Sequence, residues 1–150
     1  MKPIRSVFLS MLAAASVSAP ALAALGDDAA SVETDRVHLK GTLRVTPGVN
    51  YSVHQIQLPS GILVHEYTSP AGKVFAVTWR GPGIPDLHQL LGLYSAQLTA
   101  AANQPHYNHR QLSIQTPDVV VQSSGHLRSF FGRAWVPALL PANFSLGDLN

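Results

Sequence analysis

Residues 51–80 have the sequence YSVHQIQLPSGILVHEYTSPAGKVFAVTWR, and this stretch decides the fold. It contains three runs rich in Val, Ile, Tyr, Phe or Trp, at Tyr51 to Leu58, Ile62 to Thr68 and Lys73 to Arg80. Two turn sequences with Gly where a positive φ is wanted, Pro59-Ser60-Gly61 and Ser69-Pro70-Ala71-Gly72, separate the runs. Connections this short join antiparallel neighbours. The stretch therefore predicts a three-stranded β-meander.

Alternation along these strands assigns the side chains to faces of the sheet. Pairing Leu58 with Ile62 across the first turn puts His54 opposite Glu66 on the same face. If residues 70–72 form the second loop, one face collects large apolar side chains, namely Leu63, Tyr67, Phe75, Val77 and Trp79. We expect that face to be core. The other face also carries apolar residues, so we expect cover on both sides.

A helix follows the third strand. Asp86 and Gln89 form a capping box after the Gly81 to Pro85 segment, which ends the strand. The apolar residues then recur at helical spacing, at Leu87, Leu90, Leu91, Tyr94, Leu98 and Ala101. The pattern predicts one amphipathic helix.

Strand patterns return at Arg110 to Gln115, Val119 to Ser124 and Leu127 to Val136, with Ser124-Gly125 interpreted as a turn. The segment from Gly26 to Arg44 has a weaker pattern, which fits one short strand or an irregular lead-in. We therefore predict an α+β fold with a mostly antiparallel sheet. It consists of a β-meander, one amphipathic helix packed on one face, and a second β-meander.

The first 23 residues have the pattern of a secretory signal peptide. Lys2 and Arg5 precede an apolar run of about 11 residues, and Ala21-Leu22-Ala23 is a small-x-small cleavage site. We expect a Sec-type signal peptide over residues 1–23 and one domain over residues 24–150. The product would be periplasmic or secreted. The apolar run is too short for a spanning helix, and a chain with no Cys cannot carry a lipoprotein anchor.

Charge and composition exclude several functions. The whole chain has 10 Lys and Arg against 8 Asp and Glu, but removal of the signal would leave 8 of each. A neutral domain without a basic stripe is not expected to bind nucleic acid. The absence of Cys excludes disulfides and thiol chemistry. No P-loop or dinucleotide-binding fingerprint is present, so we expect no cofactor.

Several blocks of the sequence resemble a known family, domain of unknown function 2844, whose members are small exported proteins of Gram-negative bacteria. These blocks are Tyr51-Ser52-Val53-His54, Pro70-Ala71-Gly72-Lys73-Val74-Phe75-Ala76-Val77, Trp79-Arg80-Gly81-Pro82, Pro85-Asp86-Leu87, Leu90-Leu91-Gly92, Ser124-Gly125-His126-Leu127-Arg128 and Gly132-Arg133-Ala134. The similarity runs from about Ala24 to the C-terminus. It implies export and a single domain, and the family assigns no catalytic or binding residue.

The candidate catalytic residues are His54, Glu66 and His126. A His opposite a Glu could act as an oriented general base, with His126 or a serine supplied by the fold. The alternative is a polar cross-strand pair with no chemical role. The catalytic hypothesis requires the three side chains to converge in an open cleft.

Candidate metal ligands are His106 and His109, which form a His-x-x-His pair. Two ligands are fewer than the three or four of a zinc site, so a solvated polar loop is the alternative, and we expect no metal.

Candidate binding residues lie on the strands before and after the helix. They are Trp79, Arg80, Arg128, Arg133 and Trp135. Arg and aromatic residues are enriched among interface anchors, although aromatics in alternating strands also build cores. We expect an exported, non-enzymatic binding or accessory module for an envelope protein or a small ligand. The alternative is a hydrolase-type enzyme using the His/Glu pair.

Overall fold

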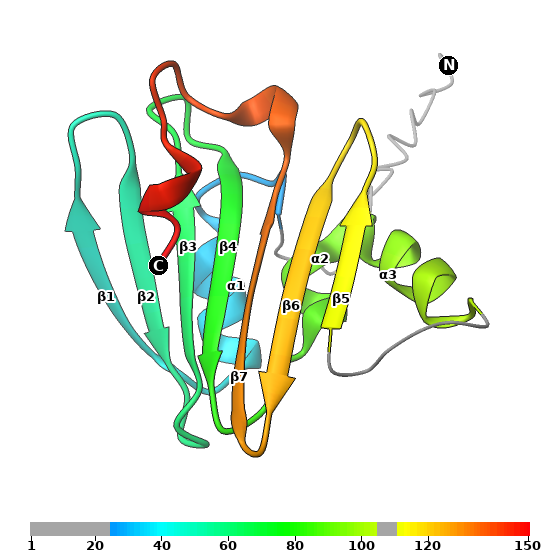
Figure 1. The fold of residues 1–150 in the computed structure, drawn as a ribbon. Coiled ribbons are helices and arrows are strands. Elements are labelled where there is room, and N and C mark those ends of the chain that lie inside the picture. Colours follow the sequence, from blue (N-terminus) through cyan, green and yellow to red (C-terminus); the bar gives the residue numbers. More distant parts are fainter. Residues whose placement is uncertain (1–24, 105–110) are drawn as a thin grey trace, which may run out of the picture.

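The computed structural model describes residues 25–104 and 111–150. The strands in these ranges are β1 Thr42–Pro47, β2 Ser52–Gln57, β3 Leu63–Thr68, β4 Val74–Gly81, β5 Gln111–Gln115, β6 Val120–His126 and β7 Ser129–Trp135. They form one seven-stranded antiparallel sheet in the order β1-β2-β3-β4-β7-β6-β5 (Figure 1). The predicted α+β class is confirmed. The predicted signal peptide lies outside the described residues.

The predicted helix after β4 is present but interrupted. It consists of α2 Leu87–Leu91, the 3-10 turn η1 Gly92–Tyr94 and α3 Ser95–Ala102. Asp86 caps α2, because its side chain accepts a hydrogen bond from the Gln89 main-chain N–H at 3.1 Å. Gly92 ends α2 with φ 49°, a conformation that glycine adopts without a steric cost.

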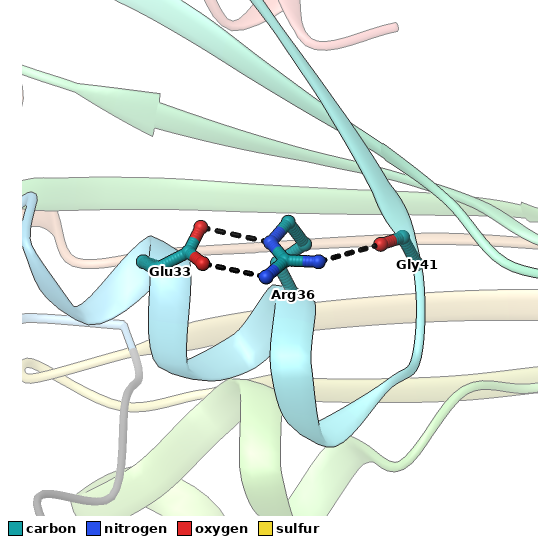
Figure 2. A network of polar contacts seen from close by, with 3 residues as sticks. All are labelled: Glu33, Arg36 and Gly41. Carbon is teal, nitrogen blue, oxygen red and sulfur yellow. Dashed lines mark hydrogen bonds and ion pairs between the residues drawn. The ribbon is translucent and has the colours of Figure 1, made fainter.

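Helix α1 (Ser31–His38) lies where the sequence predicted a strand or an irregular lead-in. Only Val32 and Asp35 of this helix are buried, and no side chain caps it, so its sequence shows little helical periodicity. Arg36 ties α1 to the chain entering β1 (Figure 2). Its guanidinium donates to the Glu33 carboxylate at 2.8 and 2.6 Å and to the Gly41 carbonyl at 3.3 Å.

Both faces of the sheet are covered at least in part, as expected. On one side, helices α1 and α2 help to enclose a core that includes Val64, Trp79 and Leu90. On the other side, the C-terminal segment (residues 137–150) crosses the sheet as the orange-to-red chain in Figure 1. It contains the 3-10 turns η2 Pro137–Leu139 and η3 Leu146–Asp148. It packs on a second cluster that contains Tyr67, Phe75, Trp135 and Leu149.

The predicted face of Val77 and Trp79 is wrong. The hairpin loop is as expected, since Thr68 pairs with Val74, but the register shifts at the next residue and Tyr67 pairs with Ala76. Phe75 is the extra residue of this β-bulge. A slip of one residue moves every later side chain to the other face. Val77 and Trp79 therefore face the helices, while Tyr67 and Phe75 face the C-terminal segment.

The turn between β6 and β7 lies three residues beyond its predicted position. His126 pairs with Ser129, and the two residues between them, Leu127 and Arg128, have φ 42° and 68°. Two positive φ values in a two-residue connection are typical of a type I′ hairpin turn. Gly125 lies within β6, where a Cβ atom would clash with the Phe130 ring.

Candidate ligand-binding groove

A groove of about 580 Å³ opens on the sheet face that the C-terminal segment only partly covers. Two rows of paired residues form its floor across β4, β7, β6 and β5. They are Thr78, Arg133, Gln122 and Ser113 in one row and Arg80, Phe131, Ser124 and Gln111 in the other. Leu149 and Asn150 border one side. This volume lies within the range of small-ligand pockets.

Arg133 is held in a fixed position on this floor. Its Nε donates to Gln122 Oε1 at 2.9 Å, and its Nη1 donates to the Leu146 carbonyl at 3.2 Å. The guanidinium carbon lies 5.5 Å from the centroid of the Trp135 ring, within cation–π range. Among the described residues, Nη2 has no hydrogen-bond partner. The cation is therefore oriented by the protein and keeps one donor group available.

Arg80 and Arg128 extend the positive charge. Arg80 is exposed and lies opposite Phe131, whose side chain is 60 % exposed. Arg128 borders an adjoining hollow that shares Arg80 and Phe131 with the groove. Across residues 25–104 and 111–150, neither these two arginines nor Arg133 has a carboxylate within ion-pair distance. The groove thus combines unneutralised guanidinium groups with an exposed aromatic ring.

Of the five predicted binding residues, Arg80 and Arg133 line the groove, and Arg128 lies beside it. Trp79 borders the groove but is only 2 % exposed and belongs to the helix-side core. Trp135 is buried in the other cluster beneath Arg133. The two tryptophans therefore take the core positions that the alternating pattern also allowed.

A second polar site lies inside the helix-side core. Asp35 on α1 and Glu66 on β3 are 0 % and 2 % exposed, and the Gln89 side-chain amide donates to Asp35 Oδ1 at 2.7 Å. The two carboxyl groups are close enough for one to hydrogen-bond to the other once one of them is protonated. Within the described chain, no other donor reaches Asp35 Oδ2 or either oxygen of Glu66. The contact therefore requires a proton on one of the two groups.

The pKa values of Asp35 and Glu66 determine which of the two groups carries that proton. Burial raises the pKa of Asp35 to about 6, against the hydrogen bonds from Gln89 and Glu66, which lower it. Burial and the neighbouring charge of Asp35 raise the pKa of Glu66 well above its usual range. Their hydrogen bond lowers the pKa of Asp35 and raises that of Glu66, so Glu66 is the partner that keeps its proton and donates it to the Asp35 carboxylate.

The predicted register of His54 opposite Glu66 is confirmed. The His54 ring, however, makes its hydrogen bond with Thr68, with Nε2 3.0 Å from Oγ1. Its Nδ1 is buried without a partner in the described part of the chain, and burial lowers the pKa of this imidazole. Neither His54 nor Glu66 lines the arginine groove.

His126 lies apart from both residues. It is exposed at the end of β6, next to the turn, and β6 lies four strand positions from β2. At roughly 4.8 Å per strand this separation is about 19 Å across the sheet. The structure does not bring His126 together with His54 and Glu66.

The metal candidates His106 and His109 lie outside the described residues. Among the residues that are described, no three His, Cys, Asp or Glu side chains come close enough to hold a metal ion. In the same ranges, every helix is too short or too polar to cross a membrane.

Sequence reasoning did not find Thr78, Gln122 and Asn150 as parts of the groove, and it interpreted Ser124 as a turn residue. Gln122 and Ser124 join Arg80 only through the β4–β7 and β7–β6 pairings. No local motif encodes those pairings. The available indications were the chemistry of Arg80 and the two-residue spacing of Arg133 and Trp135, which puts both side chains on one face of β7.

Comparisons with known proteins give one match. Neither the search of curated proteins nor the search of solved structures found a significant match. The family model described as "Protein of unknown function (DUF2844)" matches residues 21–149. This match covers most of the chain and agrees with the resemblance seen in the sequence blocks, so the chain belongs to the DUF2844 family.

Proposed function

We propose that this protein is an exported, non-enzymatic binding module whose arginine groove takes a carboxylate-bearing ligand. The observation that carries this proposal is the set of unneutralised guanidinium groups around Phe131. Guanidinium pairs well with planar carboxylates, and an exposed ring offers apolar contact beside the charge. Arg133 needs no reorganisation to bind, because Gln122 and Leu146 already orient it.

Benzoate and its uncharged analogue benzamide form a matched pair of probes for this site. We expect benzoate to shift the backbone NMR signals of Arg80, Phe131 and Arg133, and benzamide to shift them far less. Arg80→Gln should weaken benzoate binding about tenfold, because it removes a charge-assisted hydrogen bond. Arg44→Gln, an exposed arginine on the edge strand β1, is the matched control and should have no effect. Equal shifts with both probes would disprove the charge recognition.

Export is part of the same proposal and rests on the pattern of residues 1–23. When the full chain is expressed in a Gram-negative host, we expect the product in the periplasm or the medium. Its first residue should be Ala24, as read by N-terminal sequencing. A product that retains Met1 and stays in the cytosol would contradict export.

The alternative is a hydrolase-type enzyme that uses His54 and Glu66. One observation favours it, the register that puts these residues opposite each other. Glu66 is however 2 % exposed and protonated beside Asp35, and the His54 ring bonds with Thr68. A general base must be ionisable and within reach of its substrate, so the binding function has the stronger support.

A further inference from the structure

The last residues of the C-terminal segment bind the sheet as a ligand would. Leu149 is 8 % exposed and packs into the aromatic cluster with Tyr67 and Phe75. The next residue, Asn150, is polar and borders the arginine groove. An apolar side chain followed by a hydrogen-bonded main-chain group is the usual arrangement of a bound peptide.

Side chains from β3 and β4 converge on the main-chain oxygen of Asn150. Thr78 Oγ1 donates to it at 2.7 Å, His65 Nδ1 lies 2.8 Å away, and Tyr67 Oη lies 3.3 Å away and also 3.4 Å from the Asp148 carbonyl oxygen. The Asn150 N–H also donates to Tyr67 Oη at 3.0 Å. The single Tyr67 hydroxyl proton is divided between two carbonyl oxygens, so Thr78 and His65 are the two close donors to the Asn150 oxygen. Two close donors that meet at one oxygen, with a third at longer range, suit the negative charge of a carboxylate.

The surroundings of this donor set add a positive charge. Thr78 is in the same groove as Arg80, and the two residues lie on the same face of β4. Burial lowers the pKa of His65 and raises that of Tyr67, and the charge of Arg80 acts on both groups. The imidazole is therefore neutral near pH 7, with a proton available on Nδ1. Neutral donors at the centre and a cation at the border match a planar carboxylate.

We propose that residues 149–150 occupy the subsite for a partner peptide, whose free carboxylate, preceded by an apolar residue, competes with them for His65, Tyr67 and Thr78. This inference rests on the proposed function and names its ligand class. The C-terminal segment then acts as an intramolecular competitor. Its release lengthens the arginine groove toward the aromatic cluster.

The test uses a synthetic peptide with the sequence of residues 145–150, as the free acid and as the C-terminal amide, with the full chain. Leu149→Ser loosens the segment without changing a donor, and Ala142→Ser, at an exposed position of the same segment outside the groove, is the matched control. Competition predicts that the Leu149→Ser protein binds the free acid about tenfold more tightly than the unmodified chain. The Ala142→Ser protein should bind like the unmodified chain.

Two further measurements make the result decisive. Thr78→Val added to Leu149→Ser should weaken peptide binding about tenfold, and the amide should bind more weakly than the acid. If Leu149→Ser impairs folding, Asn150→Pro serves instead, because it removes the N–H that donates to Tyr67 without emptying the core. Equal affinity of the loosened and unmodified proteins for the acid would overturn the inference.

Benzoate separates the two proposals. If benzoate still binds at Arg80 while no loosened variant binds the peptide, only the peptide inference fails. If neither benzoate nor the peptide binds, both the peptide inference and the proposed function fail.

Discussion

The two faces of the sheet differ in how completely they are covered. The helix-side face is closed, and its core includes Trp79 at 2 % exposure and even a pair of buried carboxyl groups. The opposite face has an aromatic cluster under the C-terminal segment, and beside it lies the open arginine groove. One face is thus closed by helices, while the other leaves open the surface to which we assign the proposed ligand.

The largest expected effect is a difference in stability between core substitutions on the two faces. Trp79→Ala should lower the free energy of unfolding by about 3–5 kcal/mol, because it leaves a large cavity under the helices. Phe144→Ala, on the half-buried ring of the other face, should cost only about 1–2 kcal/mol. Urea unfolding of both variants measures the difference. Equal losses would show that the C-terminal segment contributes as much to the fold as the helices do.

The second prediction uses the carboxyl pair, which only the helix-side face contains. The pKa of Asp35 is raised to about 6 and that of Glu66 is raised well above its usual range, so the folded state holds more protons than the unfolded state above about pH 4. The contribution of the pair to stability is therefore complete at low pH and decreases as the pH rises through 6. The decrease should be about 1.4 kcal/mol per pH unit for each proton involved.

Glu66→Gln tests this sign. The amide can still donate to Asp35 but carries no proton to lose, so the variant should be less sensitive to pH between 5 and 8 in chemical denaturation. The exposed Glu33→Gln is the control. Its carboxylate pairs with Arg36 on the surface, and the slope should not change. A slope for Glu66→Gln as steep as that of the unmodified protein would contradict the shared proton.

The third prediction concerns the contact that joins the C-terminal segment to the sheet. Thr78→Val removes the shortest hydrogen bond to Asn150 and should lower stability by about 1 kcal/mol. It should also increase amide exchange in residues 146–150 while leaving α1 protected. Thr42→Val, an exposed position on β1, provides the matched control. Uniformly faster exchange in both regions would mean that the two faces do not open independently.

The smallest effect is expected at the β6–β7 turn, which belongs to neither face. Leu127 has φ 42°, a backbone conformation that is unfavourable for leucine. Its side chain is 85 % exposed and therefore gains little from burial. Leu127→Asn should raise the melting temperature slightly, for a gain of about 0.5 kcal/mol, because Asn tolerates this conformation. A lower melting temperature would show that Leu127 has a packing role.

The sequence predicted the strand pairing that the first local turn determines. The turn at residues 59–61 sets the pairing of β2 with β3, so the position of His54 opposite Glu66 was correct. The bulge at Phe75 has no distinctive residue, and it reversed the predicted face of Trp79. Helix α1 was missed because tertiary contacts of Val32 and Asp35, rather than helical periodicity, hold it in place.

The candidate site was predicted only in part, because it too depends on contacts between distant parts of the chain. Arg80 and Arg133 each stood out by chemistry, but their common groove depends on the pairing of β4 with β7, strands separated by the helices and two other strands. Asn150 joins them through donors from β3 and β4. Contacts between residues so distant in sequence depend on the assembled sheet rather than on a local pattern.

The strand order also has a consequence for how the chain folds. Within the described residues, every strand pairing joins neighbours in sequence except that of β4 with β7. Two local arrays can therefore form early, and the sheet is completed only when the long connection through the helices closes, at an entropic cost that local hairpins avoid. We expect Ala134→Gly, at the centre of this late junction, to change the unfolding rate more than the folding rate.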